Sequence, residues 1–444
     1  GRDSSTIELS DFSVTPCAQT AVALWTVELS LGTTAEQSDT LFIPYLFGLA
    51  FDDPGRTLYV SPDDCGWDGA YPSSLATMQW MAHVKRPEGV RSAPALLYFA
   101  AHDTAASSKT LTWIADSPPS AKQTATLQLS YVPPGASVEL GPQGFRLGFP
   151  LVLGALPTDS WWDAAMLYRG WAQGSARWLS AGPLRDRADV PSWIQADPSE
   201  SVDFWINADH KPDVMRERVA DLRRKLGLEL AVHWYEWGQY PMDTHFPVYG
   251  AFQPGLVDAV RSLQVAGVRC VPYTNARVFS LNESRTNGWD DGASRWSLKA
   301  MPTPIFQERG RLAQSLPNYV ETYEGVSGTH FAPMCSYTRY WQNRTAAIAA
   351  RLVEAGFDGV YLDQVAEAAA EPCFGDHGHP IGGGHHWESG YTALVREAQR
   401  QSAAAALRAD PPLIAVESNA EAEMSTVGAF LTWLAFGSED PTYS

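Results

Sequence analysis

The sequence predicts an N-terminal antiparallel β-sandwich followed by a (β/α)8 barrel of the TIM type that is incomplete at its C-terminal end. Three observations carry this prediction. Short apolar runs separated by Pro, Gly, Asp and Ser clusters fill the first part of the chain. Further on, such runs alternate with helical stretches, the pattern of parallel strands joined by helices. Two of the later runs each end in a carboxylate. We expect a sandwich domain over 1–158, a bridging helix and linker over 159–200, and a catalytic-type barrel domain over 201–444, truncated after about strand six.

The N-terminal runs have the length and spacing of strands in an antiparallel sandwich. They begin at Thr6, Ala21, Leu41, Ala95, Leu111 and Ala125. Asp159 and Ser160 can cap a helix that continues to about residue 179, because Trp, Tyr, Met and Ala side chains form an apolar stripe along it. Three prolines between 183 and 198 then indicate a linker.

The second part of the chain alternates strand and helix. We predict strands over 202–207, 228–233, 269–274, 358–363, 413–417 and 429–436, and helices over about 211–226, 254–266, 337–355 and 388–408, with Gly227 as a C-cap. The long irregular segment 278–335 is expected to form part of the site or a lid. A closed barrel needs eight strands, so we expect a separate polypeptide to supply the rest. An open doubly wound sheet is the alternative architecture.

Composition favours a neutral ligand. A net charge of −18 over 444 residues argues against nucleic acid or an anionic membrane as partner. The sequence contains no run of 18 apolar residues and therefore predicts no membrane-spanning helix. The 17 Trp and 17 Tyr suit sugar stacking, although core packing explains most of them. The chain starts without Met or a signal pattern, which predicts a processed or incomplete product, and sequons at Asn282 and Asn343 mildly favour a secreted, extracellular glycoprotein.

The five cysteines lack the CxxC spacing of common metal sites. Their odd number leaves at least one thiol unpaired within the chain. Cys335 and Cys373 both lie near predicted strand ends and are our first choice for a disulfide. Two buried thiols are the alternative.

Two carboxylates carry most of the functional information. Asp363 ends the apolar run 356–363, and Glu417 ends the run 412–417. In a barrel, side chains at the carboxyl ends of the strands meet in one pocket. Helix capping or pairing with Arg would explain either acid alone. Two such acids on adjacent strands favour glycosidic bond cleavage, which needs a nucleophile or base and an acid.

The segment after Asp363 is rich in Gln, His and Gly. Gln364 follows at once, and His377, His379 and His386 lie within a Gly-rich loop. Histidines can bind a metal, but their spacing matches no established zinc motif. We therefore favour hydrogen bonding to sugar hydroxyls, with a structural Gly-rich turn as the alternative, and predict neither a metal nor a cofactor.

Two other strand ends and the segment after Glu417 offer polar and aromatic groups for a substrate. The aromatic residues Trp234, Tyr235 and Trp237 can form a stacking wall, and core packing of one or two of these rings is equally consistent with the sequence. The remaining candidates are the donors Asn275 and Arg277, together with Asn419 and Glu421, of which Glu421 is a second choice for the acid/base.

Several of these segments resemble an uncharacterised family of glycosidase-like TIM-barrel proteins that join an N-terminal β-sandwich to the barrel. The resemblance is carried by 360–364 (VYLDQ), 373–384 (CFGDHGHPIGGG) and 417–421 (ESNAE), and less strongly by Pro272–Asn275 and by Met334-Cys335 with Trp341. The layout is more distantly similar to retaining α-glycosidases, including the α-amylase superfamily and endo-α-N-acetylgalactosaminidases. Those enzymes place an Asp nucleophile on the fourth strand and a Glu acid/base on the fifth.

The resemblance implies that Asp363 is the nucleophile and Glu417 the acid/base of a retaining glycoside hydrolase acting on α-linked sugars. Such a role requires a raised pKa for Glu417 and a carboxyl separation of about 5–5.5 Å. A catalytically inactive glycan-binding or structural extracellular protein on a glycosidase scaffold is the alternative function.

Overall fold

The computed structural model describes most of the chain from residue 148 onward and the strands that precede it. The described residues are 7–17, 20–29, 41–51, 57–60, 69–73, 77–85, 94–115, 123–131, 145–146, 148–196, 200–204, 211–240, 246–280, 331–370, 373, 378–380 and 382–431. Within them, no helix is long and apolar enough to cross a membrane.

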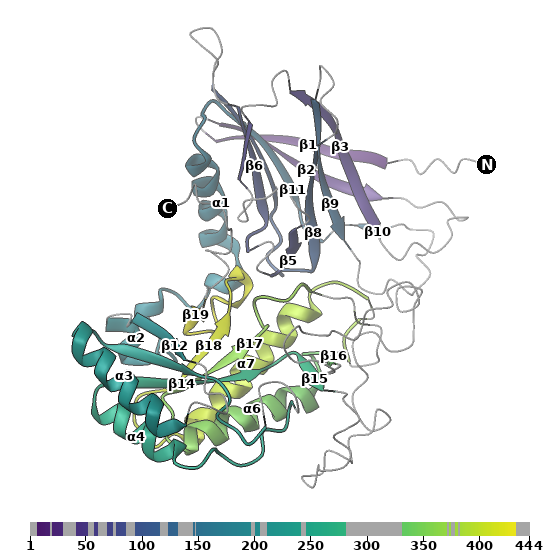
Figure 1. Ribbon diagram of the computed structural model, residues 1–444. Coiled ribbons are helices and arrows are strands. Elements are labelled where there is room, and N and C mark those ends of the chain that lie inside the picture. Colours follow the sequence, from purple (N-terminus) through teal and green to yellow (C-terminus); the bar gives the residue numbers. More distant parts are fainter. Residues whose placement is uncertain are drawn as a thin grey trace.

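Two antiparallel sheets form the N-terminal part (Figure 1). The first follows the order β1 (Ile7–Cys17), β2 (Thr20–Leu29), β11 (Leu151–Leu156), β7 (Ala95–Ala101), β6 (Trp80–Lys85) and β4 (Thr57–Val60), with β10 (Phe145–Arg146) also on β2. The second has the order β3 (Leu41–Phe51), β9 (Gln123–Tyr131), β8 (Lys109–Ala115) and β5 (Gly69–Tyr71). A shared apolar cluster joins the sheets, because Met81 and Phe99 of the first pack in one cluster with Leu111 and Leu129 of the second.

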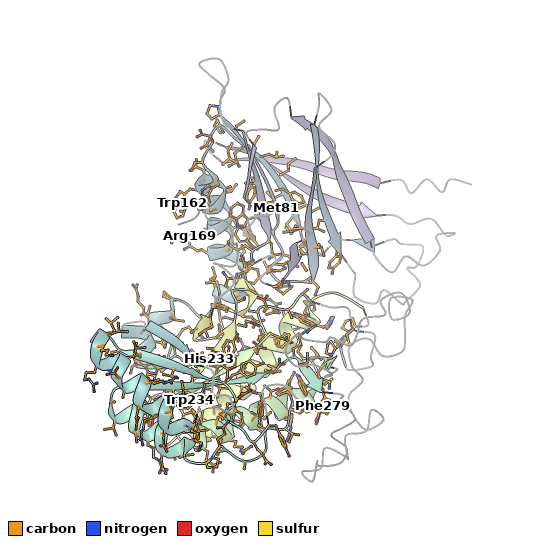
Figure 2. All side chains as sticks on the ribbon, in the orientation of Figure 1. Met81, Trp162, Arg169, His233, Trp234 and Phe279 are labelled. Atoms are coloured by element: carbon orange, nitrogen blue, oxygen red, sulfur yellow. The ribbon has the colours of Figure 1, made fainter. Side chains whose placement is uncertain are left out.

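The helix α1 (Trp161–Ser175) covers the outer face of the first sheet (Figures 1 and 2). Its buried Ala164, Tyr168 and Ala172 belong to one core cluster with Trp80 and Tyr98 of the sheet. The helix therefore packs on the strands before the chain enters the short helices η3 (Arg177–Leu179), η4 (Leu184–Asp186) and α2 (Ser192–Ala196).

Six strands of the described residues form a curled, wholly parallel sheet in the order β12 (Glu200–Phe204), β13 (Leu230–Trp234), β14 (Val268–Asn275), β17 (Gly359–Asp363), β18 (Leu413–Glu417) and β19 (Ala429–Leu431). The helices α3 (Pro212–Leu226), α4 (Leu256–Val265), α6 (Arg339–Glu354) and α7 (His386–Ala405) connect and cover it (Figure 1). The described residues thus contain six parallel strands in an open, curled sheet, so the full eight-stranded barrel stays a prediction.

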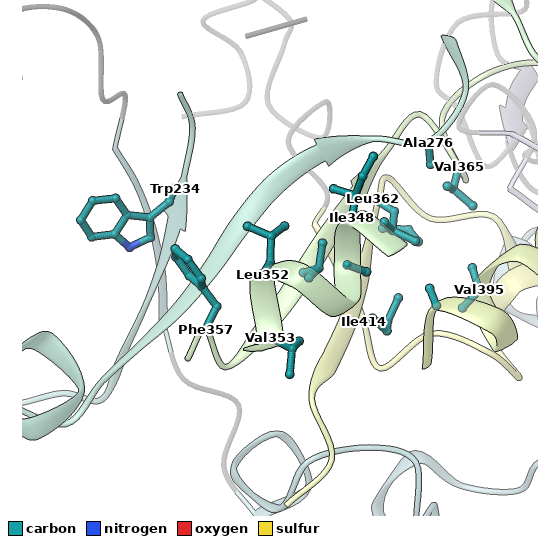
Figure 3. Packing of buried hydrophobic residues seen from close by; sticks show 14 of the residues in the cluster. Trp234, Ala276, Ile348, Leu352, Val353, Phe357, Leu362, Val365, Val395 and Ile414 are labelled. Atoms are coloured by element: carbon teal, nitrogen blue, oxygen red, sulfur yellow. The ribbon is translucent and has the colours of Figure 1, made fainter. Parts of the chain in front are cut away.

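Side chains of the parallel sheet alternate between two apolar surfaces. Val360, Leu362 and Val416 face the helices and join their buried side chains in the largest core (Figure 3). Tyr361 and Ala415, which alternate with them, belong to a separate cluster on the inner face of the sheet. Because side chains in a strand point alternately to opposite faces, this pattern assigns every strand residue to the helix side or to the inner side.

The predicted elements of the second half match the structure within a few residues. Gly227 ends α3 in the left-handed conformation with φ of +68°, as predicted for a C-cap. The segment 278–335 is less irregular than predicted, because β15 (Val278–Ser280) and β16 (Phe331–Pro333) pair antiparallel within it. Its residues 281–330 lie outside the described residues, as do 432–436 of the last predicted strand.

Candidate active site

Three neighbouring strands bring polar side chains to one edge of the parallel sheet. Asn275 of β14 is paired in register with Asp363 of β17. Leu362 of β17 is paired with Val416 of β18, so Glu417 follows at the same level as Asp363. The two carboxylates therefore leave adjacent strands at the same carboxyl edge, as the sequence predicts.

Among the described residues, Tyr273, Asn275 and Tyr361 donate hydrogen bonds to the carboxylate of Asp363. Tyr273 donates its hydroxyl to Oδ2 at 2.9 Å, and the Asn275 amide nitrogen donates to the same oxygen at 3.1 Å. Tyr361 donates to Oδ1 at 3.2 Å. Hydrogen bonds to the charged form of a carboxylate favour that form. The arrangement thus presents Asp363 as an oriented anion on the inner face of the sheet.

The Asn275 side chain is itself fixed in one orientation. Its carbonyl oxygen Oδ1 accepts the backbone N–H groups of Arg277 at 2.8 Å and Val278 at 3.0 Å. Since those groups can only donate, Oδ1 must face them and the amide nitrogen must face Asp363. The tight turn after β14 thereby aims a donor at the candidate nucleophile.

Glu417 is linked to the strand that carries Asp363. The backbone N–H of Gln364, the residue after Asp363, donates to Glu417 Oε2 at 3.1 Å. Gln364 has φ of +65°, and Ser418, the residue after Glu417, has φ of +54°. Non-glycine residues seldom adopt this left-handed conformation, and such backbone strain gathers at functional sites. A residue in the left-handed conformation therefore follows each of the two candidate acids.

Aromatic rings line the inner face beside these acids. Tyr235 is half-buried and stacks on Tyr273 with ring centroids 5.0 Å apart, and His233 lies 4.3 Å from Tyr361. Burial, followed by the negative charges of Asp363 and Glu417, raises the pKa of Tyr361 above its ordinary value. Tyr361 therefore stays a neutral hydroxyl donor beside both acids.

Two of the three predicted stacking aromatics are core residues instead. Trp234 is fully buried on the helix side of β13, in one cluster with Phe357 (Figures 2 and 3). Trp237 is also buried, and its indole N–H donates to the Tyr273 carbonyl at 2.6 Å. The strand alternation explains Trp234, because it shares the parity of Val232, which faces the helices. Of the predicted wall, only Tyr235 faces the site.

The other predicted binding residues divide by exposure. Asn419 is exposed just beyond Glu417, and Gln364 is half-buried. Arg277 is buried, and its guanidinium lies 3.5 Å from Gln364 Oε1, so it supports the Gln364 side chain after β17. His379 and His386 are buried and stacked on each other, centroids 4.3 Å apart, which leaves little of either ring open to a sugar. His377 lies outside the described residues.

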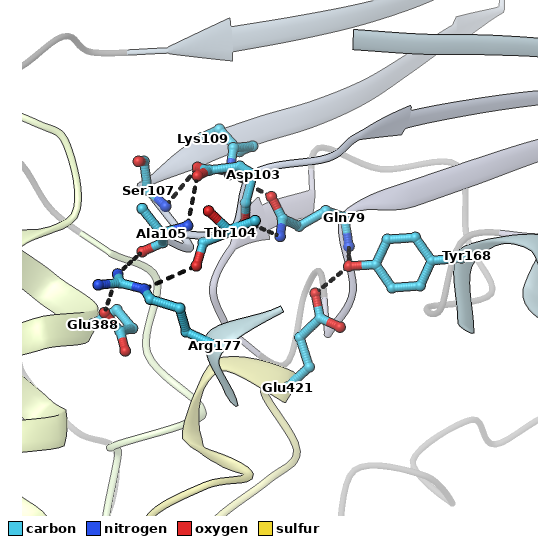
Figure 4. A network of polar contacts seen from close by, with 10 residues as sticks. All are labelled: Gln79, Asp103, Thr104, Ala105, Ser107, Lys109, Tyr168, Arg177, Glu388 and Glu421. Atoms are coloured by element: carbon cyan, nitrogen blue, oxygen red, sulfur yellow. Dashed lines mark hydrogen bonds and ion pairs between the residues drawn. The ribbon is translucent and has the colours of Figure 1, made fainter. Parts of the chain in front are cut away.

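Glu421 occupies a different environment from the one predicted for it. It begins η7 (Glu421–Glu423) and is buried against the N-terminal sheets, where Tyr168 donates to its Oε1 at 2.5 Å (Figure 4). Its backbone N–H donates to the carbonyl of Thr77 at 3.0 Å. Burial raises the pKa of Glu421 to about 7, against the opposing hydrogen bonds of Tyr168 and Tyr71. The residue belongs to the contact between the two parts of the chain.

The predicted disulfide is not formed. Cys335 and Cys373 are both thiols, buried, and lie in one group with His379.

Of the two sequons, Asn343 is exposed on α6 while its Thr345 is fully buried, and Asn282 lies outside the described residues.

Sequence reasoning missed the tyrosines that hold Asp363. Tyr361 lies two residues before Asp363, and Tyr273 lies two residues before Asn275. A spacing of two along a strand places side chains on the same face. This parity was available in the sequence and would have assigned both hydroxyls to the site.

The fold resembles the folds of solved glycosidases. It resembles an α-N-acetylgalactosaminidase from Bifidobacterium bifidum with a TM-score of 0.62 at 12% identity, covering 96% of this chain and 74% of that one. The same enzyme in complex with GalNAc gives a TM-score of 0.63, covering 96% of this chain and 71% of that one. At this level of identity the likeness concerns the fold alone.

The chain belongs to the family described as the domain of unknown function DUF6259, whose model matches residues 145–437. A Monosiga brevicollis protein named "Putative glycoside hydrolase 22789" is 32% identical over 93% of this chain and 34% of its own length. A Bacteroides thetaiotaomicron protein named "Putative glycoside hydrolase" is 24% identical over 53% of this chain and 34% of its own length. The chain thus spans about a third of the length of these relatives.

Proposed function

We propose that this chain provides the catalytic face of a retaining glycoside hydrolase that acts on α-linked sugars. The observation that carries the proposal is the link between two strand-end acids: Glu417 accepts a hydrogen bond from the residue after Asp363. Retaining enzymes place a pair of carboxyl groups about 5–5.5 Å apart, on either side of the scissile bond. The names of the relatives and the fold likeness support the same class.

Asp363 is the nucleophile in this proposal. Hydrogen bonds from Tyr273, Asn275 and Tyr361 favour the carboxylate form of Asp363, and the carboxylate is the form that can act as a nucleophile. Asp363 attacks the anomeric carbon while the bond to the leaving oxygen breaks. A covalent glycosyl-enzyme results.

Glu417 is the acid/base. It donates a proton to the leaving oxygen in the first step and removes a proton from the attacking water in the second. The Gln364 N–H donates to Glu417 Oε2 and holds this carboxyl group next to the strand that carries Asp363. Water then attacks the same face from which the leaving group departed, and the configuration at the anomeric carbon is retained.

Tyr235 and Asn419 are the proposed substrate contacts around these acids. Tyr235 is half-buried on the inner face, so its ring can stack on a sugar, and Asn419 is exposed at the rim. Gln364 adds a half-buried side-chain amide. A carbohydrate is the partner that such a mixture of stacking and hydrogen-bonding groups suits.

The proposal is tested with a panel of aryl α- and β-glycosides, with proton NMR following the anomer first released. We expect turnover of an α-glycoside with retention, and a loss of about 10⁴-fold or more in kcat for Asp363→Asn. Asp410→Asn is the matched control, because Asp410 caps Ser192 at the opposite end of β18. Inversion would refute the retaining mechanism. Sugar binding without turnover in the wild type would instead favour the glycan-binding function.

We also propose that the protein is a secreted glycoprotein. Asn343 is exposed on α6 and can carry a glycan. Enzymatic removal of N-glycans from protein isolated from its native source should lower its mass, and Asn343→Gln should abolish the part of the shift due to this site. An unchanged mass would oppose glycosylation.

A further inference from the structure

We propose that Cys335, Cys373 and His379 bind a zinc ion that fastens the loop after β17 to the start of α6. The three side chains are buried, and their ligand atoms all lie within 4.8 Å of one another. Two thiolates and an imidazole are the ligands that zinc prefers in proteins. The inference is independent of the glycosidase proposal.

The spacing of the ligand atoms suits a tetrahedral ion. Zinc lies about 2.3 Å from sulfur and about 2.0–2.1 Å from nitrogen, so two such ligands at a tetrahedral angle are about 3.5 Å apart. The distance from Cys335 Sγ to His379 Nε2 is 3.4 Å. Three protein ligands leave the fourth position for water or another donor, as in other sites with two cysteines and one histidine.

The tautomer of His379 supports metal binding. Its Nδ1 lies 2.8 Å from the carbonyl oxygen of Pro380, which can only accept, so Nδ1 carries the proton. Nε2 therefore presents its lone pair toward the sulfurs. A ligand histidine in metal sites almost always donates its other ring nitrogen in this way, which fixes the ring and raises its basicity.

The surrounding backbone holds the ligands in place. Cys373 exchanges two backbone hydrogen bonds with Gly382, at 2.8 and 2.7 Å, which close the loop that carries His379. His379 also stacks on His386, the first residue of α7.

This geometry favours a metal over a disulfide. A disulfide requires sulfurs about 2.05 Å apart and uses no third group, so the aim of His379 Nε2 at the cluster would have no purpose in it. A metal uses all three side chains. The ion would support the candidate active site through the residues that lie between the two. The N–H of Met334, the residue before Cys335, donates to the Arg277 carbonyl at 2.7 Å, and Arg277 contacts Gln364 beside the candidate acids.

The test begins with purified protein that carries no polyhistidine tag. After incubation with zinc and gel filtration, we expect about one zinc per chain by mass spectrometry of the metal. Replacement by cobalt should give a thiolate-to-cobalt charge-transfer band in the near ultraviolet. Cys335→Ser, Cys373→Ser and His379→Ala should each remove or shift that band and reduce the zinc content.

Cys270→Ala is the matched control, because Cys270 is equally buried but lies in the sheet core outside the cluster. It should keep its zinc and its cobalt band. Zinc-free wild-type protein would overturn the proposal, as would an intact mass lower by two hydrogen atoms at these cysteines. Zinc retained in the Cys335→Ser, Cys373→Ser double variant would also overturn it. If that variant fails to fold, the wild-type stoichiometry and cobalt spectrum still decide.

Discussion

Two buried glutamates, one at the end of β18 and one just after it, have different partners. Glu417 ends β18 and meets the Gln364 N–H across the parallel sheet, beside the donors of Asp363. Glu421 lies four residues further along the chain and is enclosed by Tyr168, Tyr71 and the N-terminal sheets. The first is placed by strand register and the second by a contact between two parts of the chain. Proximity in sequence therefore does not make them members of one site.

The two regions also differ in the partners of their carboxylates. At the candidate active site, neutral hydroxyl and amide donors surround Asp363. At the interface, Lys109 is buried and pairs with Asp103 at 2.9 Å, while Gln79 accepts from the same ammonium group at 2.7 Å (Figure 4). The donors named for Asp363 are neutral, whereas Lys109 and Asp103 neutralise each other.

The largest expected effect separates the two glutamates by activity. Glu417→Gln should lower kcat/KM for a substrate with a poor leaving group by about 10²–10⁴-fold and leave the melting temperature near that of the wild type. For Glu421→Gln, the change in melting temperature should dominate. Steady-state kinetics and thermal unfolding of both variants measure this. Equal losses of activity with native stability in both would place Glu421 in the chemistry and break the comparison.

The second prediction concerns the buried ion pair of the interface. Lys109→Met should lower the free energy of unfolding by about 3–5 kcal/mol, because it leaves Asp103 buried without its cation. Lys225→Met is the control: Lys225 pairs with Asp221 on the exposed surface of α3, where no measurable loss is expected. Urea unfolding compares the two. A small effect of Lys109→Met would mean that water reaches Asp103.

Features that depend on local sequence signals could be predicted, and features that depend on contacts between distant segments could not. The strands and their terminal acids were predictable because they depend on local signals: apolar runs of strand length and caps such as Gly227. Glu421 was not, because its burial depends on Tyr168 and Thr77, far away in the sequence. The cluster of Cys335, Cys373 and His379 shows no linear metal motif, since folding alone brings two separate segments together.

The third prediction uses the pH dependence of stability. Glu421 has a pKa of about 7 in the folded protein against an ordinary value of 4.5. The folded state therefore holds the proton more tightly, and stability falls as pH rises from about 4.5 to about 7. The contribution is up to about 3 kcal/mol.

Glu421→Gln should remove this component, so the variant should gain stability relative to the wild type as pH rises through the same window. Glu423 is also buried with a raised pKa, and for this reason the difference between variant and wild type is the quantity to measure. Urea unfolding at several pH values supplies it. A difference that does not vary with pH would show that Glu421 titrates normally.

The smallest expected effects come from two tyrosines that each donate to a carboxylate, Tyr273 to Asp363 and Tyr168 to Glu421. A hydrogen bond to a charged group contributes about 1.5–3 kcal/mol. Tyr273→Phe should therefore lower kcat/KM by about tenfold or more with little change in stability. Tyr168→Phe removes a bond that holds down the pKa of Glu421, so the pH window of the stability loss should move upward. If Tyr168→Phe altered activity and Tyr273→Phe altered only stability, the two regions would have exchanged the roles assigned to them.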